Sequence, residues 1–177
     1  MPGGPLQGIR VVDLTSVVVG PLCTQILADH GAEVIKVEAS KGDLARNLNG
    51  KSVTPSMGAK FLHLNRNKRS ITCDISQTEG QALIKRLVPH CDVFIENFKV
   101  GDMARYGLDF DSLKTLNPRL VYCSITGYGQ TGPKKSDPAI DGVIQAVSGM
   151  MSITGTPETG PLKSGSTIVD YCTGYAA

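Results

Sequence analysis

Short β-branched runs alternate with amphipathic segments along this chain, and this alternation most constrains its fold. Residues 9–14 have the pattern of a strand buried on both faces, and residues 32–38 repeat it. Between them, Pro21 suits a first helical turn and Gly31 a helix C-terminus, so we expect a helix that ends near His30. A helix that joins two strands in this way is the βαβ unit of a parallel sheet.

The same alternation continues along the chain. A capping box of Ser76 and Glu79 predicts the start of another helix, and the polar residues 39–60 predict a long surface loop. Further strands are expected over residues 70–75, 92–96 and 120–125, with short helices near residue 103 and over 111–116. The fold class predicted is therefore α/β, a Rossmann-like, mostly parallel sheet with helices on both faces. Ligands of such folds bind beyond the carboxyl ends of the strands.

Composition excludes several classes of protein. A chain of 177 residues buries roughly 70% of its unfolded surface, so it needs neither disulfides nor metals to fold. A net charge of +2 is too low for non-specific nucleic-acid binding, and we expect no nucleic-acid partner. The chain lacks an apolar run long enough for a membrane span, and residues 1–5 lack the features of a signal peptide, so the sequence predicts a cytoplasmic protein.

The five cysteines are scattered, without a CxxC pair or a neighbouring histidine cluster, which argues against both a metal site and a disulfide framework. Cys73, Cys91 and Cys123 lie in or beside strand-like runs, so small buried thiols are the favoured interpretation. The three histidines have no spacing typical of a triad or a metal site.

Two motifs allow a ligand-binding interpretation. Residues 127–132 match GxGxxG, but the prolines and polar residues at 133–138 cannot continue the required helix, and we interpret the motif as a glycine-rich turn. Arg66, Lys68 and Arg69 form either a solvated charge run or a site that neutralises a polyphosphate.

Asp170 lies at the end of a β-branched run, residues 166–171. This position is typical of a carboxylate that a strand end presents to a cleft. A helix N-cap is the commoner role for such an aspartate, and the residues alone leave both interpretations open.

Several segments taken together resemble the family III CoA-transferases, the carnitine and formyl-CoA transferase group. The matching segments, in the order of the family, are residues 5–14, 20–21, 27–38, 65–71, 92–98, 106–108, 117–118, 124–129 and 145–151. The resemblance begins at Pro5 and covers essentially the whole chain. It implies transfer of coenzyme A between carboxylic acids, with acyl-CoA and a carboxylic acid acceptor as partners.

The resemblance also assigns a role to Asp170, because residues 165–174 match the surroundings of the family's covalent nucleophile. The carboxylate would attack the donor thioester and become an aspartyl-CoA thioester, which the acceptor carboxylate then attacks. This chemistry needs no metal and no tightly bound cofactor, since CoA or acyl-CoA is a substrate.

The resemblance implies a set of CoA-binding residues: Val17 at the adenine end, Asn97 and Phe98 along the nucleotide and pantetheine, Arg105 near phosphate, and Lys68 and Arg69 as further phosphate partners. Two positions depart from relatives. Ala39 replaces an arginine and Pro138 a lysine, so Lys41 and Lys135 are the neighbouring cations that would compensate.

Two alternatives stay open. The superfamily includes α-methylacyl-CoA racemases, but Ile140 stands where those enzymes have a histidine before the aspartate matched by Asp141, and isoleucine cannot transfer a proton.

Because the family's members are much longer, residues 1–177 are expected to be a truncated N-terminal CoA-binding α/β domain that lacks the C-terminal half. We expect exposed apolar surface, association into a homodimer or a larger species, and impaired turnover. The second alternative is a non-catalytic remnant that binds CoA or a partner chain.

Overall fold

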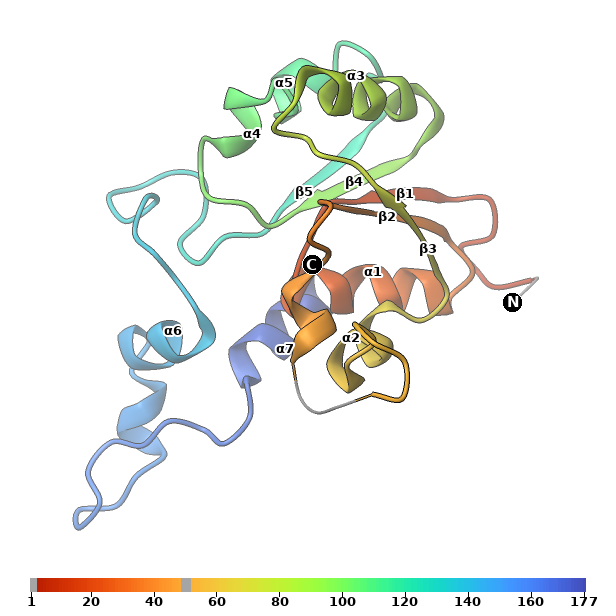
Figure 1. Cartoon of the computed structure of the whole chain (residues 1–177). Coiled ribbons are helices and arrows are strands. Elements are labelled where there is room, and N and C mark those ends of the chain that lie inside the picture. The colour runs from red at the N-terminus through yellow and green to blue at the C-terminus, as the bar shows by residue number, and fades with distance from the viewer. Residues whose placement is uncertain (1–2, 49–51) are drawn as a thin grey trace.

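The computed structural model of the chain describes residues 3–48 and 52–177. Within these residues, five parallel strands form one sheet in the order β3-β2-β1-β4-β5 (Figure 1). The strands are β1 Arg10–Asp13, β2 Glu33–Glu38, β3 Lys68–Thr72, β4 Val93–Glu96 and β5 Val121–Ser124. This is the order of the first five strands in a Rossmann-type sheet. The predicted parallel α/β architecture is confirmed.

Helices cover both faces of the sheet. Figure 1 shows α3, α4 and α5 above it and α1, α2 and α7 below it. The helices are α1 Val19–Asp29, α2 Ala59–Asn65, α3 Thr78–Leu87, α4 Asp102–Arg105, α5 Phe110–Leu113, α6 Asp141–Val147 and α7 Ile168–Ala176, with 3₁₀ turns η1 Leu44–Asn47, η2 Val88–His90 and η3 Met150–Ile153. Within the described residues, the structure contains no helix with the length and apolarity that a bilayer crossing requires.

The core has one cluster on each side of the sheet, because successive side chains of a strand point to opposite faces. Val11 packs with Cys23 of α1, whereas Val12 packs with Ile84 of α3 and Leu113 of α5. Both valines are almost fully buried. The central strand β1 is therefore buried on both faces, as its sequence predicts.

Two predicted elements have wrong boundaries. β3 begins at Lys68, two residues earlier than expected, and ends at Thr72. The capping box also fails, because α3 begins at Thr78 and Ser76 instead donates its hydroxyl and its N–H to Asp74 Oδ1 at 2.7 and 3.0 Å. Ser76 therefore stabilises a local turn with Asp74 and, contrary to the prediction from the sequence pattern, does not cap the helix.

The predicted loop over residues 39–60 contains the turn η1, and α2 begins at the end of this loop. Residues 49–51 of the loop lie outside the described residues, and so do residues 1 and 2, which belong to the N-terminal segment 1–5. The cysteines are free thiols. Cys73 and Cys91 are buried as predicted, whereas Cys123 is only partly buried.

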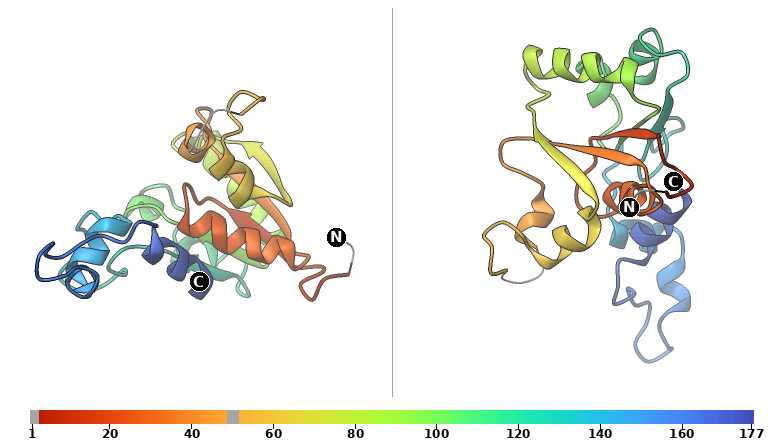
Figure 2. Two further views of the ribbon diagram at one scale, coloured as in Figure 1. Left: turned by 90° about the horizontal axis from the view of Figure 1, so that it is seen from below. Right: turned by 90° about the vertical axis from the view of Figure 1, so that its right-hand side faces the viewer.

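After β5 the chain leaves the sheet. Residues 138–165, which include α6 and η3, project from the body as an arm (Figures 1 and 2). The chain then returns as α7, which packs against α1. This return brings the C-terminal residues back to the body of the molecule.

Candidate functional site

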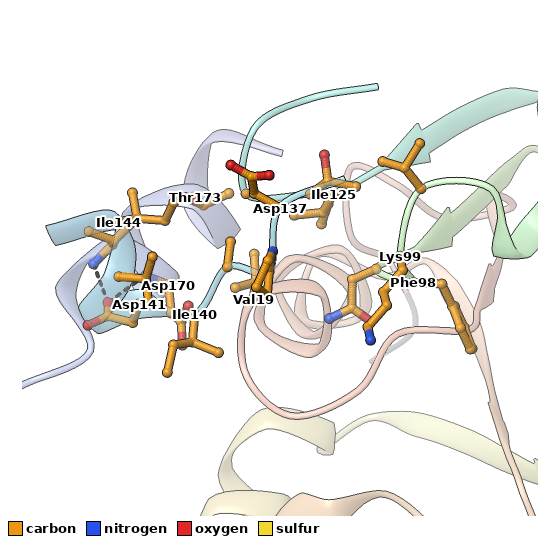
Figure 3. Close-up of a pocket in the computed structure, with 18 of the residues that line it drawn as sticks. Val19, Phe98, Lys99, Ile125, Asp137, Ile140, Asp141, Ile144, Asp170 and Thr173 are labelled. Atoms are coloured by element: carbon orange, nitrogen blue, oxygen red, sulfur yellow. Dashed lines mark hydrogen bonds between the residues drawn. The ribbon is translucent and has the colours of Figure 1, made fainter. Parts of the chain in front are cut away.

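A cavity of about 830 Å³ opens between the carboxyl end of the sheet and the returning chain (Figure 3). Its walls come from the segments that follow β4 and β5, the start of α1, and helices α6 and α7. Residues on its wall include Val19, Asn97, Phe98, Lys99, Asp102, Ile125, Lys135, Ile140, Asp141, Ile144, Asp170 and Thr173. The cavity therefore occupies the place where parallel α/β folds bind ligands.

Asp170 lines this cavity from the first turn of α7. Sequence reasoning offered a strand end or an N-cap, and both are wrong, since the helix begins at Ile168 and its N-cap position is Thr167. The carboxyl group is half-buried. Burial raises its pKa, and the neighbouring Asp141 adds to this effect, while Lys60 opposes it.

Asn97 lies just beyond the end of β4 and lines the cavity. Its side chain holds the backbone of Ser16, donating from Nδ2 to the carbonyl at 3.0 Å and accepting the N–H at Oδ1 at 2.9 Å. Phe98 lies beside it, and its N–H donates to Glu96 Oε2 at 2.8 Å. The structure thus brings Asn97, Phe98 and Asp170 to one cavity.

Val17 lies in the loop between β1 and α1, with a φ of 70°. This left-handed conformation is strained for a β-branched residue. The loop is held by side chains, because the Val17 N–H donates to both carboxylate oxygens of Asp43, at 3.1 and 3.2 Å, and Lys36 Nζ donates to the Thr15 carbonyl at 2.9 Å. Lys36 and Asp43 themselves form an almost fully buried ion pair, at 2.9 Å. Val17 does not line the cavity wall, but its loop is tied to that wall through Asn97.

Lys68 is a core residue. Its ammonium group donates to Asp13 Oδ2 at 3.1 Å, to the Pro21 carbonyl at 2.9 Å and to Asn65 Oδ1 at 2.9 Å, and its side chain is 1% exposed. Burial lowers the pKa of Lys68 to about 8, although Asp13 opposes this effect. The three donors of the ammonium are engaged, so the structure does not support a phosphate-binding role for Lys68.

Arg69 and Arg66 also lie away from the cavity. Arg69 forms an exposed ion pair with Glu33, at the start of β2, and Arg66 pairs with Asp29, at the end of α1. The starts of the strands lie at the edge of the sheet opposite the cavity. Arg66 and Arg69 are therefore solvated, paired surface residues, and the structure does not support the polyphosphate interpretation for them.

Arg105 is exposed on α4, where it pairs with Asp102 at 3.0 Å and lies 4.9 Å from the Tyr106 ring centroid. Asp102 lines the cavity, so Arg105 is one ion pair away from its wall. Lys135, which is predicted to compensate for Pro138, lines the cavity wall with it. Lys41, which is predicted to compensate for Ala39, does not line the wall. Lys99 also lines the wall and was not predicted, although it follows Asn97 and Phe98 directly in the sequence.

Helix α6 contributes two polar side chains that sequence reasoning did not assign to the site. Asp141 is 7% exposed and Gln145 is fully buried. Their spacing of four residues places them on one face of a helix, which is a signal that the sequence alone contains. Among the described residues, the structure has no cluster of histidine, cysteine or acidic residues that could hold a metal ion.

The cavity combines a half-buried carboxylate with apolar walls and lysines. A carboxylate with a raised pKa is more basic than one in water, and apolar walls keep water away from a reactive intermediate. This arrangement suits nucleophilic attack on an activated carbonyl carbon.

Comparison with known proteins identifies the family. The chain is 48% identical to a succinate–glutarate CoA-transferase of Agrobacterium fabrum, over 96% of this chain and 44% of that protein. It is 42% identical to a succinyl-CoA:glutarate CoA-transferase of Homo sapiens, over 98% of this chain and 40% of that protein. A crystal structure of a CAIB/BAIF family protein from Brucella suis superposes with a TM-score of 0.93 at 45% identity, over 98% of this chain and 47% of the other.

The chain thus spans less than half the length of these relatives. The family model described as CoA-transferase family III matches residues 6–177. Matches over nearly the whole chain, in both sequence and fold, lead to one conclusion: this chain belongs to CoA-transferase family III.

Proposed function

We propose that the chain takes part in the transfer of coenzyme A between carboxylic acids, with Asp170 as the covalent nucleophile. The observation that carries this proposal is the position of the Asp170 carboxyl group, half-buried in the wall of the cavity that Asn97 and Phe98 also line. The family resemblance assigns these three residues to one site. Their convergence in space supports that assignment.

The proposed reaction has four steps. The Asp170 carboxylate attacks the carbonyl carbon of the donor thioester, the C–S bond breaks, and CoA leaves as a thiolate, giving a mixed anhydride. The thiolate then attacks the Asp170 carbonyl carbon and releases the donor acid as a carboxylate, which leaves an aspartyl-CoA thioester. The acceptor carboxylate attacks this thioester, and the released thiolate attacks the acceptor carbonyl of the new anhydride, which restores Asp170.

The CoA-binding residues belong to the same proposal. Val17, Asn97 and Phe98 would contact the nucleotide and the pantetheine, and Arg105 a phosphate at the cavity mouth. Lys99 and Lys135, on the cavity wall, replace Lys68 and Arg69 as proposed phosphate partners, since lysine binds phosphate as a compact point charge.

The substrates of relatives guide the choice of acids. The relatives from Agrobacterium fabrum and Homo sapiens are named for succinate or succinyl-CoA and glutarate, so dicarboxylic acids are the proposed donor and acceptor class. We further propose that this 177-residue chain forms a homodimer, that its turnover is impaired and that it is located in the cytoplasm.

The test is incubation of the chain with succinyl-CoA, followed by intact-mass analysis. We expect a mass increase equal to CoA minus water, which is absent in Asp170→Ala and Asp170→Asn. Asp74→Asn, which changes an exposed carboxylate in a turn outside the cavity wall, is the matched control and should retain the adduct.

Other outcomes would contradict the proposal. Saturable CoA binding without an adduct supports the non-catalytic remnant. Exchange of the α-proton of an acyl-CoA into deuterated water supports a racemase, although Ile140, which is 73% exposed at the cavity wall, supplies no proton.

A further inference from the structure

The carboxylate of Asp141 binds the first turn of α7, the helix that carries Asp170. Its Oδ1 accepts the N–H of Val169 at 2.8 Å and the N–H of Asp170 at 3.1 Å. Figure 3 shows Asp141 and Asp170 side by side, one on α6 and the other on α7. Asp141 is therefore hydrogen-bonded to the backbone of the proposed nucleophile itself.

This contact replaces the helix's own cap. The first four N–H groups of a helix have no partner within it, and an N-cap side chain normally accepts from the second or third residue. Thr167 holds the N-cap position of α7, but its side chain makes no capping hydrogen bond to any described residue. Val169 and Asp170 are the second and third residues of α7, so Asp141 performs this function from 29 residues away.

Gln145 extends the contact by one helical turn. It donates from Nε2 to Asp141 Oδ2 at 2.5 Å and accepts the N–H of Ser164 at Oε1 at 2.8 Å. Gln145 is fully buried, and within the described residues no buried side-chain polar atom lacks a partner. Each polar group of this pair thus points at a defined neighbour, and both ends of segment 164–170 are attached to α6.

We propose that Asp141 and Gln145 are positioning residues for the Asp170 carboxyl group. The pair fixes the first turn of α7, and through it the place where the nucleophile enters the cavity. Neither side chain needs to contact substrate for this role. The inference deepens the proposed function and rests on it for its consequence in catalysis, whereas the positioning itself can be measured without turnover.

Position and charge act separately on Asp170. Asp141 on α6 is a second negative charge near the carboxyl group, and Lys60 on α2 is a positive one; Lys99, Lys135 and Asp137 line the same cavity. Removing the charge of Asp141 lowers the pKa of Asp170, because one of the two effects that raise it is lost. An experiment must therefore change position and charge independently.

The chain offers a pair of substitutions that does so. In Asp141→Asn the new amide donor faces the Gln145 Nε2 donor, and the hydrogen bond between the two side chains is lost. In Asp141→Asn/Gln145→Glu the pattern is restored, since Asn Oδ1 accepts from Val169 and Asp170, Asn Nδ2 donates to the new glutamate, and the glutamate accepts from Ser164. The double variant keeps the net charge but moves the negative charge from residue 141 to residue 145.

Three measurements are made on each variant: hydrogen exchange of the Val169 and Asp170 amides, the pKa of Asp170 from its carboxyl ¹³C shift, and the rate of CoA adduct formation from succinyl-CoA. Asp141→Asn should increase amide exchange and slow adduct formation by about tenfold or more, since small displacements of a reacting group have large effects on rate. The double variant should restore both to within about threefold of the original chain. The pKa of Asp170 should be lowered in both variants.

Asp109→Asn is the matched control, because Asp109 caps α5 on the opposite face of the sheet. It should leave all three measurements unchanged. The inference is overturned if Asp141→Asn leaves amide exchange and adduct rate as in the original chain, or if the double variant recovers neither.

The two proposals fail differently. If the original chain forms no adduct, the proposed function fails, and amide exchange alone decides whether the pair positions α7. If the adduct forms but its rate follows the pKa of Asp170 rather than amide exchange, the pair acts through charge and the positioning role is rejected.

Discussion

At the scale of single residues, the half-buried carboxyl group of Asp170 lowers the stability of the fold at neutral pH and serves the proposed chemistry. Its pKa is raised, first by burial and then by Asp141, so the folded chain binds the proton of this carboxyl group more tightly than the unfolded chain does. Such a group favours folding below its unfolded pKa, and that contribution is lost as the pH rises through the folded pKa. At pH 7, which lies above the unfolded pKa, this carboxyl group therefore lowers the stability of the fold.

Asp170→Asn should consequently stabilise the chain at pH 7. The expected rise in melting temperature is about 1–2 °C, because solvent screens a half-buried group. The gain should disappear at a pH below about 3.9, the ordinary value of an unfolded aspartate, since the carboxyl group is then neutral in both states. Thermal unfolding of both chains across this pH range is the measurement, and an equal or lower melting temperature at pH 7 would contradict the prediction.

Lys68 shows why a charge run cannot be assigned from sequence alone. The sequence shows three cations within four residues, but not that Asp13, 55 residues earlier, lies within 3.1 Å of one of them. That pairing depends on the parallel register of β1, β2 and β3, which places Lys68 beside Val34. The proposed role of Asp170, in contrast, rests on its surroundings in the family, and the local structure that the sequence predicts for it is wrong.

Lys68→Met separates the core role from the phosphate role. It leaves Asp13 buried without its ion-pair partner, which costs about 3 kcal/mol in the free energy of unfolding. Urea unfolding at neutral pH measures this loss. Arg69→Met, which removes only an exposed ion pair, should change the free energy by less than about 1 kcal/mol. A Lys68→Met chain with unchanged stability and weakened CoA binding would restore the phosphate interpretation.

At the scale of elements, sequence periodicity predicted the strands better than the helix that carries the site. β1, β2, β4 and β5 have short β-branched cores, and the structure places them within a residue or two of the predicted bounds. α7 begins with Ile168 and Val169, which also favour strands, so the sequence pattern is ambiguous there. The helix is selected by tertiary contacts, through its packing on α1 and the cap from Asp141.

The contact between α7 and α1 depends on Gly174. A Cβ atom at this position would lie 2.8 Å from the Val19 carbonyl oxygen and 2.9 Å from Leu22 Cδ2. Gly174→Ala gains about 1 kcal/mol of helix propensity, but overpacking against backbone costs about 1–3 kcal/mol. We expect a net loss of about 1 kcal/mol in the free energy of unfolding, together with slower adduct formation, because α7 is displaced.

Gly165→Ala is the control for this substitution. No described heavy atom beyond its chain neighbours lies within 4 Å of a Cβ at that position. Its free energy of unfolding should stay within about 0.5 kcal/mol of the original chain. Equal behaviour of the two alanine variants, in unfolding and in adduct formation, would show that close packing of α7 is not required.

At the scale of the whole molecule, the arm of residues 138–165 exposes apolar side chains that the body does not cover. Ile140 is 73% exposed, Val147 53% and Ile153 85%. Ile140 directly precedes α6, Val147 is the last residue of α6, and Ile153 is the last residue of η3. Clustered exposed apolar surface is typical of an interface, whereas single exposed apolar residues are common on any protein. The arm is therefore where association of this chain should begin.

Val147→Lys/Ile153→Lys tests this expectation in the intact chain. Charges at both positions would have to be desolvated in an interface, so the double variant should be monomeric at concentrations where we expect the original chain to form dimers or larger species. Sedimentation velocity over a concentration series measures the change. Val53→Lys is the control, because Val53 is fully exposed but lies outside the arm, and it should associate as the original chain does. If the double variant and the control associate equally, another surface holds the copies together; if the original chain is monomeric throughout, its exposed apolar arm does not drive association.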